Sequence, residues 1–269
     1  MYQFFIEDEN AAEDFVTIEG SDVNHIKNVL RMKPGEKIRV CTRNGQNYFC
    51  SISDITESFV RADILEKEAE STELPCRIYL FQGLPKNDKM EWIIQKTVEL
   101  GVYEVIPVAM KNCVVKLDDK KAKSKVTRWQ AIAESAAKQS KRSLIPEVKM
   151  PMSYKEAVAY AKKLDVKLVP YENEDGMAGT KAAMEQIKKG ESIAVFIGPE
   201  GGFSDGEVEL AMQSGVKPVT LGKRILRTET AEMQLISLGR RILRTETAGI
   251  AALAILGYQL ESQTDGRDA

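Results

Sequence analysis

The chain has 269 residues, of which 43% are hydrophobic, and this is enough apolar material for two ordinary domains or one large one. The composition excludes a disordered or fibrous protein. The longest nearly apolar run, Ala248 to Gly257, is too short for a membrane span, which needs about eighteen residues or more. The first ten residues turn acidic, where a signal peptide would be basic and then apolar. We therefore expect a soluble cytoplasmic protein without a membrane partner.

The cysteine and histidine content indicates that the chain binds no metal. The four cysteines are spaced too widely for a C-x-x-C pair, so we expect four reduced, partly buried thiols. They are Cys41, Cys50, Cys76 and Cys113. His25 is the only histidine, which excludes any site that needs two imidazoles. A lone histidine beside apolar neighbours is more often a structural hydrogen-bonding residue than a functional one, and we favour the structural role here.

The net charge of −2 conceals a segregation of charge along the chain. Ten basic residues and three acidic ones lie between Lys111 and Arg142, so this segment carries +7 and the rest of the chain −9. One basic face on an acidic protein is typical of a protein that binds a phosphate backbone. A solvated helix face without a partner explains the same charges equally well.

Residues 1 to about 72 predict a small β-rich domain. Its strands are interrupted by one helical stretch, Asp22 to Arg31, and by the turn pairs Pro34-Gly35 and Asn44-Gly45. The expected strands are FFI, KIRVCT, YFCSISDI and VRADILE. Residues 66–75 have no apolar periodicity and end in proline, so we expect two domains, 1–72 and 73–269.

From Arg77 onward, predicted strands and helices alternate, which favours an α/β domain with a parallel sheet covered on both faces. The expected strands are RIYLFQG, EVIPVAM, VKLVPY, SIAVFIG and VKPVTLG. The expected helices are about 88–100, one through Trp129 and Ala137, about 181–189, 205–213, and a terminal one from about Gly249. Ligands of such domains bind at the carboxyl ends of the strands.

One of these strands, SIAVFIG, runs into a glycine-rich turn, Gly198 to Ser204, where main-chain amides can approach a ligand. The turn is neither a dinucleotide fingerprint nor a phosphate-binding P-loop, and an ordinary tight turn is the plain alternative. Residues 202–206 also match the hydrolase motif G-x-S-x-G. A hydrolase needs a histidine after its serine, and His25 lies far upstream, so we expect Ser204 to cap the next helix in a capping box with Glu207.

One segment of the chain occurs twice, as Leu221–Ala231 and Leu238–Ala248, with the second copy starting seventeen positions after the first. Ten of the eleven positions are identical and the exception is Lys223 against Arg240. Two copies are too few for a solenoid, which needs at least three. We interpret the repeat as a local duplication inserted into a working loop.

With these motifs, the sequence resembles the RsmE-type ribosomal-RNA uridine N3-methyltransferases of the SPOUT superfamily over nearly its whole length. The two most specific motifs are IGPEGGFS and LGxRILRTETA. The weaker ones are His25-Ile26, Val29-Leu30-Arg31, Gly35, Lys86, Lys89, Glu91 to Gly101, Arg128-Trp129, Ala136 to Arg142, and Pro146.

The resemblance implies a PUA-like β-barrel domain for RNA and a SPOUT domain whose C-terminal trefoil knot holds S-adenosylmethionine. It also implies a homodimer that methylates a uridine near the 3′ end of 16S rRNA in the small ribosomal subunit. The expected cofactor-binding residues are Ile197, Gly198, Pro199, Glu200, Gly201, Gly202, Leu221, Gly222, Ile225, Leu226, Leu238, Gly239, Arg241, Ile242, Leu243, Thr247 and Ala248.

The family carries the second motif once, whereas this chain carries it twice. We expect the strand VKPVTLG to end at Leu221-Gly222 and the knotted helix to begin after Thr247, with the duplicated length of chain looped out. In the alternative, Leu235 to Gly239 replaces that strand and the first copy bulges.

Methylation of uridine N3 requires an unpaired base, a group that takes the N3 proton, and stabilisation of the charge that develops on the base. An arginine with a carboxylate supplies both functions. The candidate catalytic residues are Arg227 with Glu229, Arg244 with Glu246, and Glu200. The candidate RNA-binding residues are Arg31, Lys86, Lys89, Lys111, Lys116, Arg128 and Arg142. The alternative function is an RNA- or ribosome-binding module whose donor site the duplication has impaired.

Overall fold

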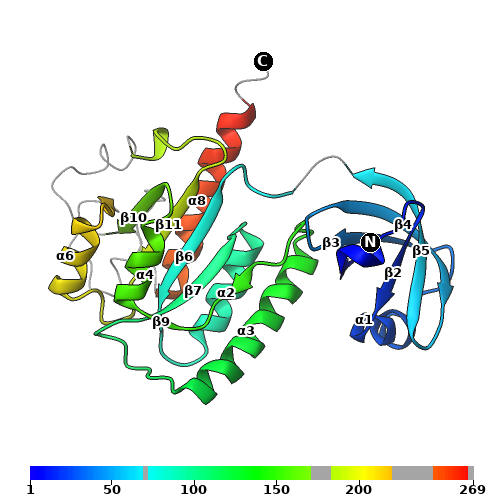
Figure 1. Ribbon diagram of the computed structural model, residues 1–269, viewed down its shortest axis with the longest axis horizontal. Coiled ribbons are helices and arrows are strands. Elements are labelled where there is room, and N and C mark those ends of the chain that lie inside the picture. The colour runs from blue at the N-terminus through cyan, green and yellow to red at the C-terminus, as the bar shows by residue number, and fades with distance from the viewer. Residues whose placement is uncertain (69–71, 171–182, 220–244, 266–269) are drawn as a thin grey trace. The chain divides into compact units, whose positions relative to one another are not determined.

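The computed structural model describes residues 1–68, 72–170, 183–219 and 245–265 (Figure 1). The chain divides into two compact units. The first unit contains Met1–Glu73 together with Glu134–Ile145, and the second contains Leu74–Ala133 with Pro146–Ala269. The first unit therefore includes a segment that the predicted boundary assigns to the second domain.

The first unit is built on a curled five-stranded sheet. Its order is β1-β3-β4-β5-β2, in which β1 runs parallel to β3 and the other neighbours are antiparallel. The two edge strands β1 and β2 also approach each other. The strands are β1 (Tyr2–Ile6), β2 (Phe15–Glu19), β3 (Lys37–Thr42), β4 (Asn47–Ile55) and β5 (Phe59–Glu68). Four were predicted, and the short strand β2 was missed.

The core of this unit lies inside the curl of the sheet. Alternate residues of the strands point inward, as in β2, where Val16 and Ile18 are buried. Ile26, in the helical segment that follows β2, is also buried in this core. The Asn44-Gly45 turn connects β3 to β4 as predicted, and Gly45 has a φ of 86°, a left-handed conformation that glycine adopts without strain.

The predicted helix from Asp22 to Arg31 is real but irregular. One α-helical turn, α1 (Ser21–Asn24), continues into a π-helical turn, η2 (His25–Val29), in which the N–H of Leu30 donates to the carbonyl of His25. Arg31 ends the segment with a φ of 52°. π-helical turns are rare and occur often at functional sites.

The second unit is built on a parallel sheet, as the alternating pattern predicted. The order is β12-β10-β11-β6-β7-β8, with β9 also pairing with β7, and every pairing is parallel. The strands are β6 (Arg77–Gly83), β7 (Glu104–Ala109), β8 (Glu147–Val148), β9 (Met152–Ser153), β10 (Val166–Pro170), β11 (Ser192–Ile197) and β12 (Lys217–Val219). Residues 193–197 of β11 are all buried, which explains their uninterrupted apolar sequence.

Helices flank this sheet (Figure 1). They are α2 (Lys89–Glu99), α3 (Asp119–Gln139), α4 (Tyr154–Ala161), α6 (Asp205–Gln213) and α8 (Thr245–Asp265). α2 packs against α8, and α4 packs against α6. Gly101 and Gly215 follow α2 and α6 with φ of 96° and 76°, so both helices stop where the sequence predicted. α8 begins a full turn before the predicted start, and α4 was not predicted.

Several predictions fall on residues outside the described ranges. The expected helix at 181–189 lies partly there, and so does the stretch 220–244, in which the trefoil knot is expected. The knot therefore stays a prediction.

Within the described residues, no helix is long and apolar enough to cross a membrane, and no group of three or more possible ligands could hold a metal ion. All four cysteines are buried without a disulfide, and burial raises the pKa of the Cys41 thiol to about 12.

Candidate functional site

The glycine-rich turn lies at the carboxyl end of β11, beside the end of β6. Ile197 pairs with Gln82 of β6, and Gly198, Pro199 and Gly202 are buried. After the turn, Ser204 is the N-cap of α6 and forms a capping box with Glu207, whose carboxylate accepts hydrogen bonds from the main-chain N–H and the hydroxyl of Ser204 at 2.8 and 2.9 Å. The predicted capping role of Ser204 is thereby confirmed.

Two glycines allow the main chain to approach this closely. A Cβ at Gly83, the last residue of β6, would lie 2.6 Å from the nitrogen of Pro199. A Cβ at Gly201 would lie 2.8 Å from the Cβ of Asn112. Side chains at these positions would push the turn away from the strand ends, so glycine is required for packing as well as for conformation.

Asn112, which follows β7, holds the turn by its side chain. Its Nδ2 donates to the carbonyl of Gly201 at 2.9 Å and to that of Gly202 at 3.1 Å. Next to it, the N–H of Lys111 donates to Glu207 at 2.8 Å. The segment after β7 therefore fixes both the turn and the helix cap that follows it. Sequence reasoning missed Asn112 because nothing in its local pattern distinguishes it from a loop residue.

Glu200 anchors the middle of the turn to the segment after β6. Its carboxylate accepts from the N–H of Lys86 at 3.0 Å and forms an ion pair with Lys89 at 3.2 Å. Burial raises the pKa of the Glu200 carboxyl, but hydrogen bonds from its own N–H, from Lys86 and from Lys89 outweigh this, so the pKa is lowered. An ionised carboxylate that is already hydrogen-bonded is a weak proton acceptor. The geometry favours anchoring over catalysis for Glu200.

Gln82 presents a buried polar atom at the same edge of the sheet. The residue is fully buried and its Nε2 donates to the carbonyl of Gly83 at 3.1 Å. Its Oε1 accepts no hydrogen bond from any described residue, although buried polar atoms usually have a partner. A Cβ at Gly249, in the first turns of α8, would lie 3.5 Å from this oxygen. Gln82 therefore offers an acceptor beside the glycine turn and the start of α8.

The other half of the predicted site falls outside the described residues. These positions are Leu221, Gly222, Ile225, Leu226, Arg227, Glu229, Leu238, Gly239, Arg241, Ile242, Leu243 and Arg244. Of Glu246, Thr247 and Ala248 the structure describes only the backbone, in the first turn of α8. The segment Lys217–Val219 pairs with β10 as β12, so the first copy of the repeat follows a strand and the second leads into α8.

The predicted RNA-binding residues occupy different environments. Arg31, Lys86, Lys111 and Lys116 are exposed. The Arg128 side chain is 66% exposed and its Nη2 lies 2.7 Å from Glu91. The ammonium group of Lys89 is engaged with Glu200, as described above.

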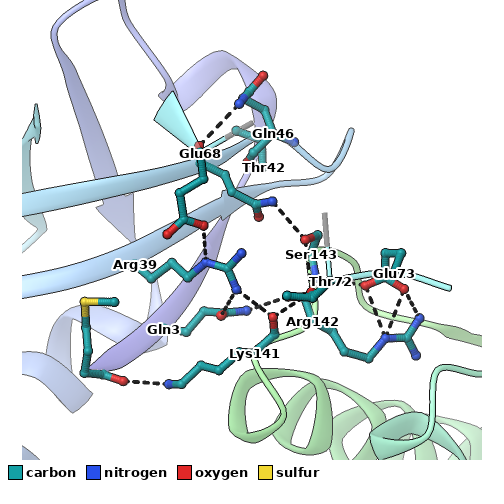
Figure 2. A network of polar contacts seen from close by, with 12 residues as sticks. Gln3, Arg39, Thr42, Gln46, Glu68, Thr72, Glu73, Lys141, Arg142 and Ser143 are labelled. Atoms are coloured by element: carbon teal, nitrogen blue, oxygen red, sulfur yellow. Dashed lines mark hydrogen bonds and ion pairs between the residues drawn. The ribbon is translucent and has the colours of Figure 1, made fainter. Parts of the chain in front are cut away.

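Two expectations about single residues need correction. Arg142 was counted with the exposed basic residues, but it is 3% exposed and forms an ion pair with Glu73 (Figure 2). It is therefore not accessible to phosphate. His25 was expected to be a structural hydrogen-bonding residue. Its side chain is exposed and makes no hydrogen bond within the described part of the chain, so that expectation is wrong.

Comparison with known proteins identifies the family. Residues 72–236 and 231–257 match an RNA methyltransferase domain, and residues 18–65 match the PUA domain of RNA methyltransferases. The chain is 40% identical over 240 residues to ribosomal RNA small subunit methyltransferase E of Bacillus subtilis, covering 87% of this chain and 93% of that protein. The chain belongs to the ribosomal RNA small subunit methyltransferase E family. It is therefore an RNA methyltransferase, and the resemblance found in the sequence is confirmed.

Solved structures related to the methyltransferase E family share both fold and length with this chain. The enzyme of Neisseria gonorrhoeae, solved bound to S-adenosyl methionine, is 31% identical with a TM-score of 0.74, covering 94% of this chain and 95% of that one. A methyltransferase of Legionella pneumophila, in complex with the same cofactor, is 29% identical with a TM-score of 0.75, covering 95% and 96%. The SPOUT-type α/β fold with a PUA domain is thereby established.

Proposed function

We propose that this protein transfers a methyl group from S-adenosylmethionine to N3 of a uridine in the 16S rRNA of the small ribosomal subunit. The observation that carries the proposal is the glycine turn at the carboxyl edge of the parallel sheet, fixed by Asn112 and Glu200, in a chain of this family. Relatives named for small-subunit ribosomal RNA support the substrate, and the relatives solved with S-adenosyl methionine support the donor.

The described residues fit such a donor. Gln82 supplies a buried acceptor without a partner among the described residues, and the glycines keep the main chain of Ile197–Gly202 open to close approach. These groups suit a neutral adenosine better than a phosphate, because Glu200 places a negative charge in the turn. When bound, S-adenosylmethionine supplies an electrophilic methyl group. The residues of LGxRIL and Thr247-Ala248 complete the proposed site.

The protein must also bring the uridine into a reactive state. The base has to be unpaired, and the proton on N3 has to leave as the nitrogen attacks. We assign proton acceptance to Glu229 or Glu246, and stabilisation of the charge on the base to Arg227 or Arg244. Glu200 is less suited to the proton step, because its carboxylate is already bound by Lys86 and Lys89.

The remaining expectations form part of the same proposal. Arg31, Lys86, Lys111, Lys116 and Arg128 contact RNA phosphates, which gives affinity without sequence selectivity. The protein acts in the cytoplasm as a homodimer with a knotted C-terminal segment. The first copy of the repeat keeps its place after β12, and the additional length of chain precedes α8.

The test uses the purified full chain, S-adenosylmethionine carrying a labelled methyl group, and small ribosomal subunits that lack the modification. Labelled 3-methyluridine after nucleoside digestion is the expected product. Label in another nucleoside, or none, would overturn the proposal. In the latter case the duplicated motif would favour the alternative, an RNA- or ribosome-binding module without methyl transfer.

A second experiment tests the catalytic assignment. Replacing Glu229 and Glu246 together by glutamine should lower kcat by about 10²-fold or more, the usual contribution of a general base. Binding of S-adenosylmethionine, measured by calorimetry, should remain. An unchanged kcat would remove the carboxylates of the repeat from the mechanism.

A further inference from the structure

The first unit contains a cavity of about 500 Å³ that has no role in the function proposed so far. It lies between β1, the α1–η2 segment, and the last turn of α3 with the residues that follow it, and every lining residue belongs to the first unit. Its volume lies within the range of small-ligand pockets, about 300–1,000 Å³. The floor includes the buried Phe4, and the rim includes Tyr2, which is 51% exposed.

Two lysines line the cavity, and they differ in their charge partners. Lys138 forms ion pairs with Asp22 at 3.0 Å and Glu134 at 2.9 Å, so its charge is compensated. The ammonium group of Lys141 donates to the carbonyl of Met1 at 2.6 Å and has no carboxylate partner within the described chain. Because an ammonium group has three donors, Lys141 retains the capacity to bind an anion.

The position of Lys141 is fixed by a polar network that includes the buried side chains of Arg39 and Gln3 (Figure 2). Its carbonyl accepts from Arg39 at 2.6 Å and from Thr72 at 2.9 Å, and the carbonyl of Arg142 accepts from Gln3 at 2.6 Å. Lys141 has a φ of 61°, a left-handed conformation that is strained for a residue with a side chain. A strained residue that hydrogen bonds hold in place is a frequent feature of binding sites.

His25 completes the lining with an exposed imidazole at the first position of the π-helical turn. As described above, the imidazole has no hydrogen-bond partner in the described part of the chain. An unpaired imidazole and an exposed phenol both present aromatic faces, and single-stranded RNA is recognised by stacking of unpaired bases on such faces. The cavity therefore combines aromatic groups with a lysine ammonium group that has no carboxylate partner among the described residues.

We propose that this cavity binds a single unpaired nucleotide of the RNA substrate, with its phosphate on Lys141 and its base against Tyr2 and His25. The inference rests on the proposed function in one respect, that the substrate is RNA. It adds a second point of RNA contact, separate from the glycine turn and from the exposed cations named above. It also assigns a role to the one histidine of the chain.

Because His25 is the only histidine, its ring protons report on the cavity without signals from other histidines. The experiment follows these resonances by NMR in the full chain during titration with uridine 5′-monophosphate and with octauridylate. We expect a saturable shift with both ligands and a weaker response to uridine, which lacks the phosphate. An equal shift with inorganic phosphate alone would show that the cavity binds an anion without recognising the base, and this would overturn the proposal.

Two variants test the location of binding. Ser135→Trp places a large ring in the cavity from an exposed helix position, and we expect it to weaken nucleotide binding at least tenfold. Lys141→Asn removes the charge but keeps a residue that tolerates positive φ, and we expect a loss of about tenfold. The matched control is Lys33→Ala, an exposed lysine of the same unit outside the cavity, which should bind as wild type.

The outcomes separate this proposal from the proposed function. An unmoved His25 resonance, or equal affinity in wild type and Ser135→Trp, would overturn the cavity assignment even if the enzyme forms 3-methyluridine. A saturable shift that both variants weaken would support the assignment even if no methyl transfer occurs.

Discussion

At the residue scale, Asn112 is the side chain on which the geometry of the glycine turn most depends. It supplies two hydrogen bonds to carbonyls of the turn, each worth about 0.5–1.5 kcal/mol. Asn112→Ala should therefore weaken S-adenosylmethionine binding about tenfold, measured by calorimetry, because the turn loses its fixed position. Wild-type affinity would show that the turn is held by other contacts. Asn28→Ala, at an exposed asparagine outside the glycine turn, is the control.

Glu104, at the start of β7, makes stability depend on pH. Burial raises the pKa of its carboxyl, against hydrogen bonds from Tyr160 at 2.9 Å and from Lys149. A raised pKa means that the folded state binds the proton more tightly than the unfolded state. The resulting stability is fully present below the unfolded pKa, about 4.5, and is lost as pH rises through the folded value.

Glu104→Gln cannot ionise, and its amide oxygen can still accept from Tyr160. Lys149 keeps Glu147 as its partner at 2.6 Å. The melting temperature of the variant relative to wild type should therefore rise between pH 4 and pH 7.5. Glu209→Gln, on the exposed face of α6, should show no such trend. A constant difference between variant and wild type would contradict the assignment.

At the element scale, the sequence predicted those segments whose local pattern agrees with their tertiary environment. β11 is almost entirely buried and reads as an apolar run, and α2 and α6 end at glycines with positive φ. The short elements β2, β8 and β9 were missed, because strands of so few residues carry too little periodicity. α4 was missed although its capping box, Ser153 with Glu156, is visible in the sequence.

The residues of the candidate site also differ in whether a local sequence pattern predicts them. The glycine turn and the cap at Ser204 are local motifs, so the sequence alone located them. Asn112 and Gln82 act through contacts made only when distant segments meet, and no local pattern encodes such contacts. A polar residue directly after the run Ile78–Phe81 was the one available signal for Gln82, and sequence reasoning missed it.

The close approach of β6 to the glycine turn leads to a prediction about stability. Gly83→Ala should destabilise the protein by about 1–3 kcal/mol, because its Cβ would meet main-chain and ring atoms of Pro199 at 2.6–2.8 Å. Gly206→Ala is the matched control, since it lies in α6 with nothing within 4 Å of its Cβ. The free energy of unfolding from chemical denaturation distinguishes them. Equal stability of the two variants would mean that the end of β6 moves away from Pro199 without loss of stability.

The repeat can be tested by deletion between two defined elements. Removing residues 222–238 leaves one complete LGRRILRTETA, which begins after β12 and ends in the first turn of α8. We expect S-adenosylmethionine affinity equal to or higher than that of the full chain, because we expect one copy of the motif to suffice for the donor site. Loss of donor binding in a variant that still unfolds cooperatively would show that both copies belong to the site.

At the scale of the whole molecule, the segregation of charge should govern RNA binding. The chain carries −2 in total while its segment from 111 to 142 carries +7, so attraction to RNA depends on a few cations. We expect affinity for a small-subunit RNA fragment to fall steeply with salt. Lys116→Ala should lower the slope of log K against log salt by about one. Lys163→Ala, an exposed lysine outside this segment, should leave the slope unchanged.

The discontinuity of the first unit has a consequence for how the chain matures. Its buried network joins Arg39 and Gln3 to main-chain carbonyls of residues 141 and 142, and Asn47 to Ser143 at 2.8 Å. During synthesis, Met1–Glu73 emerges from the ribosome before these partners exist. The polar side chains of Met1–Glu73 that bind this segment therefore lack their hydrogen-bond partners until Glu134–Ile145 has been translated. An enzyme proposed to modify ribosomes thus completes its first unit only after the start of its second has been made.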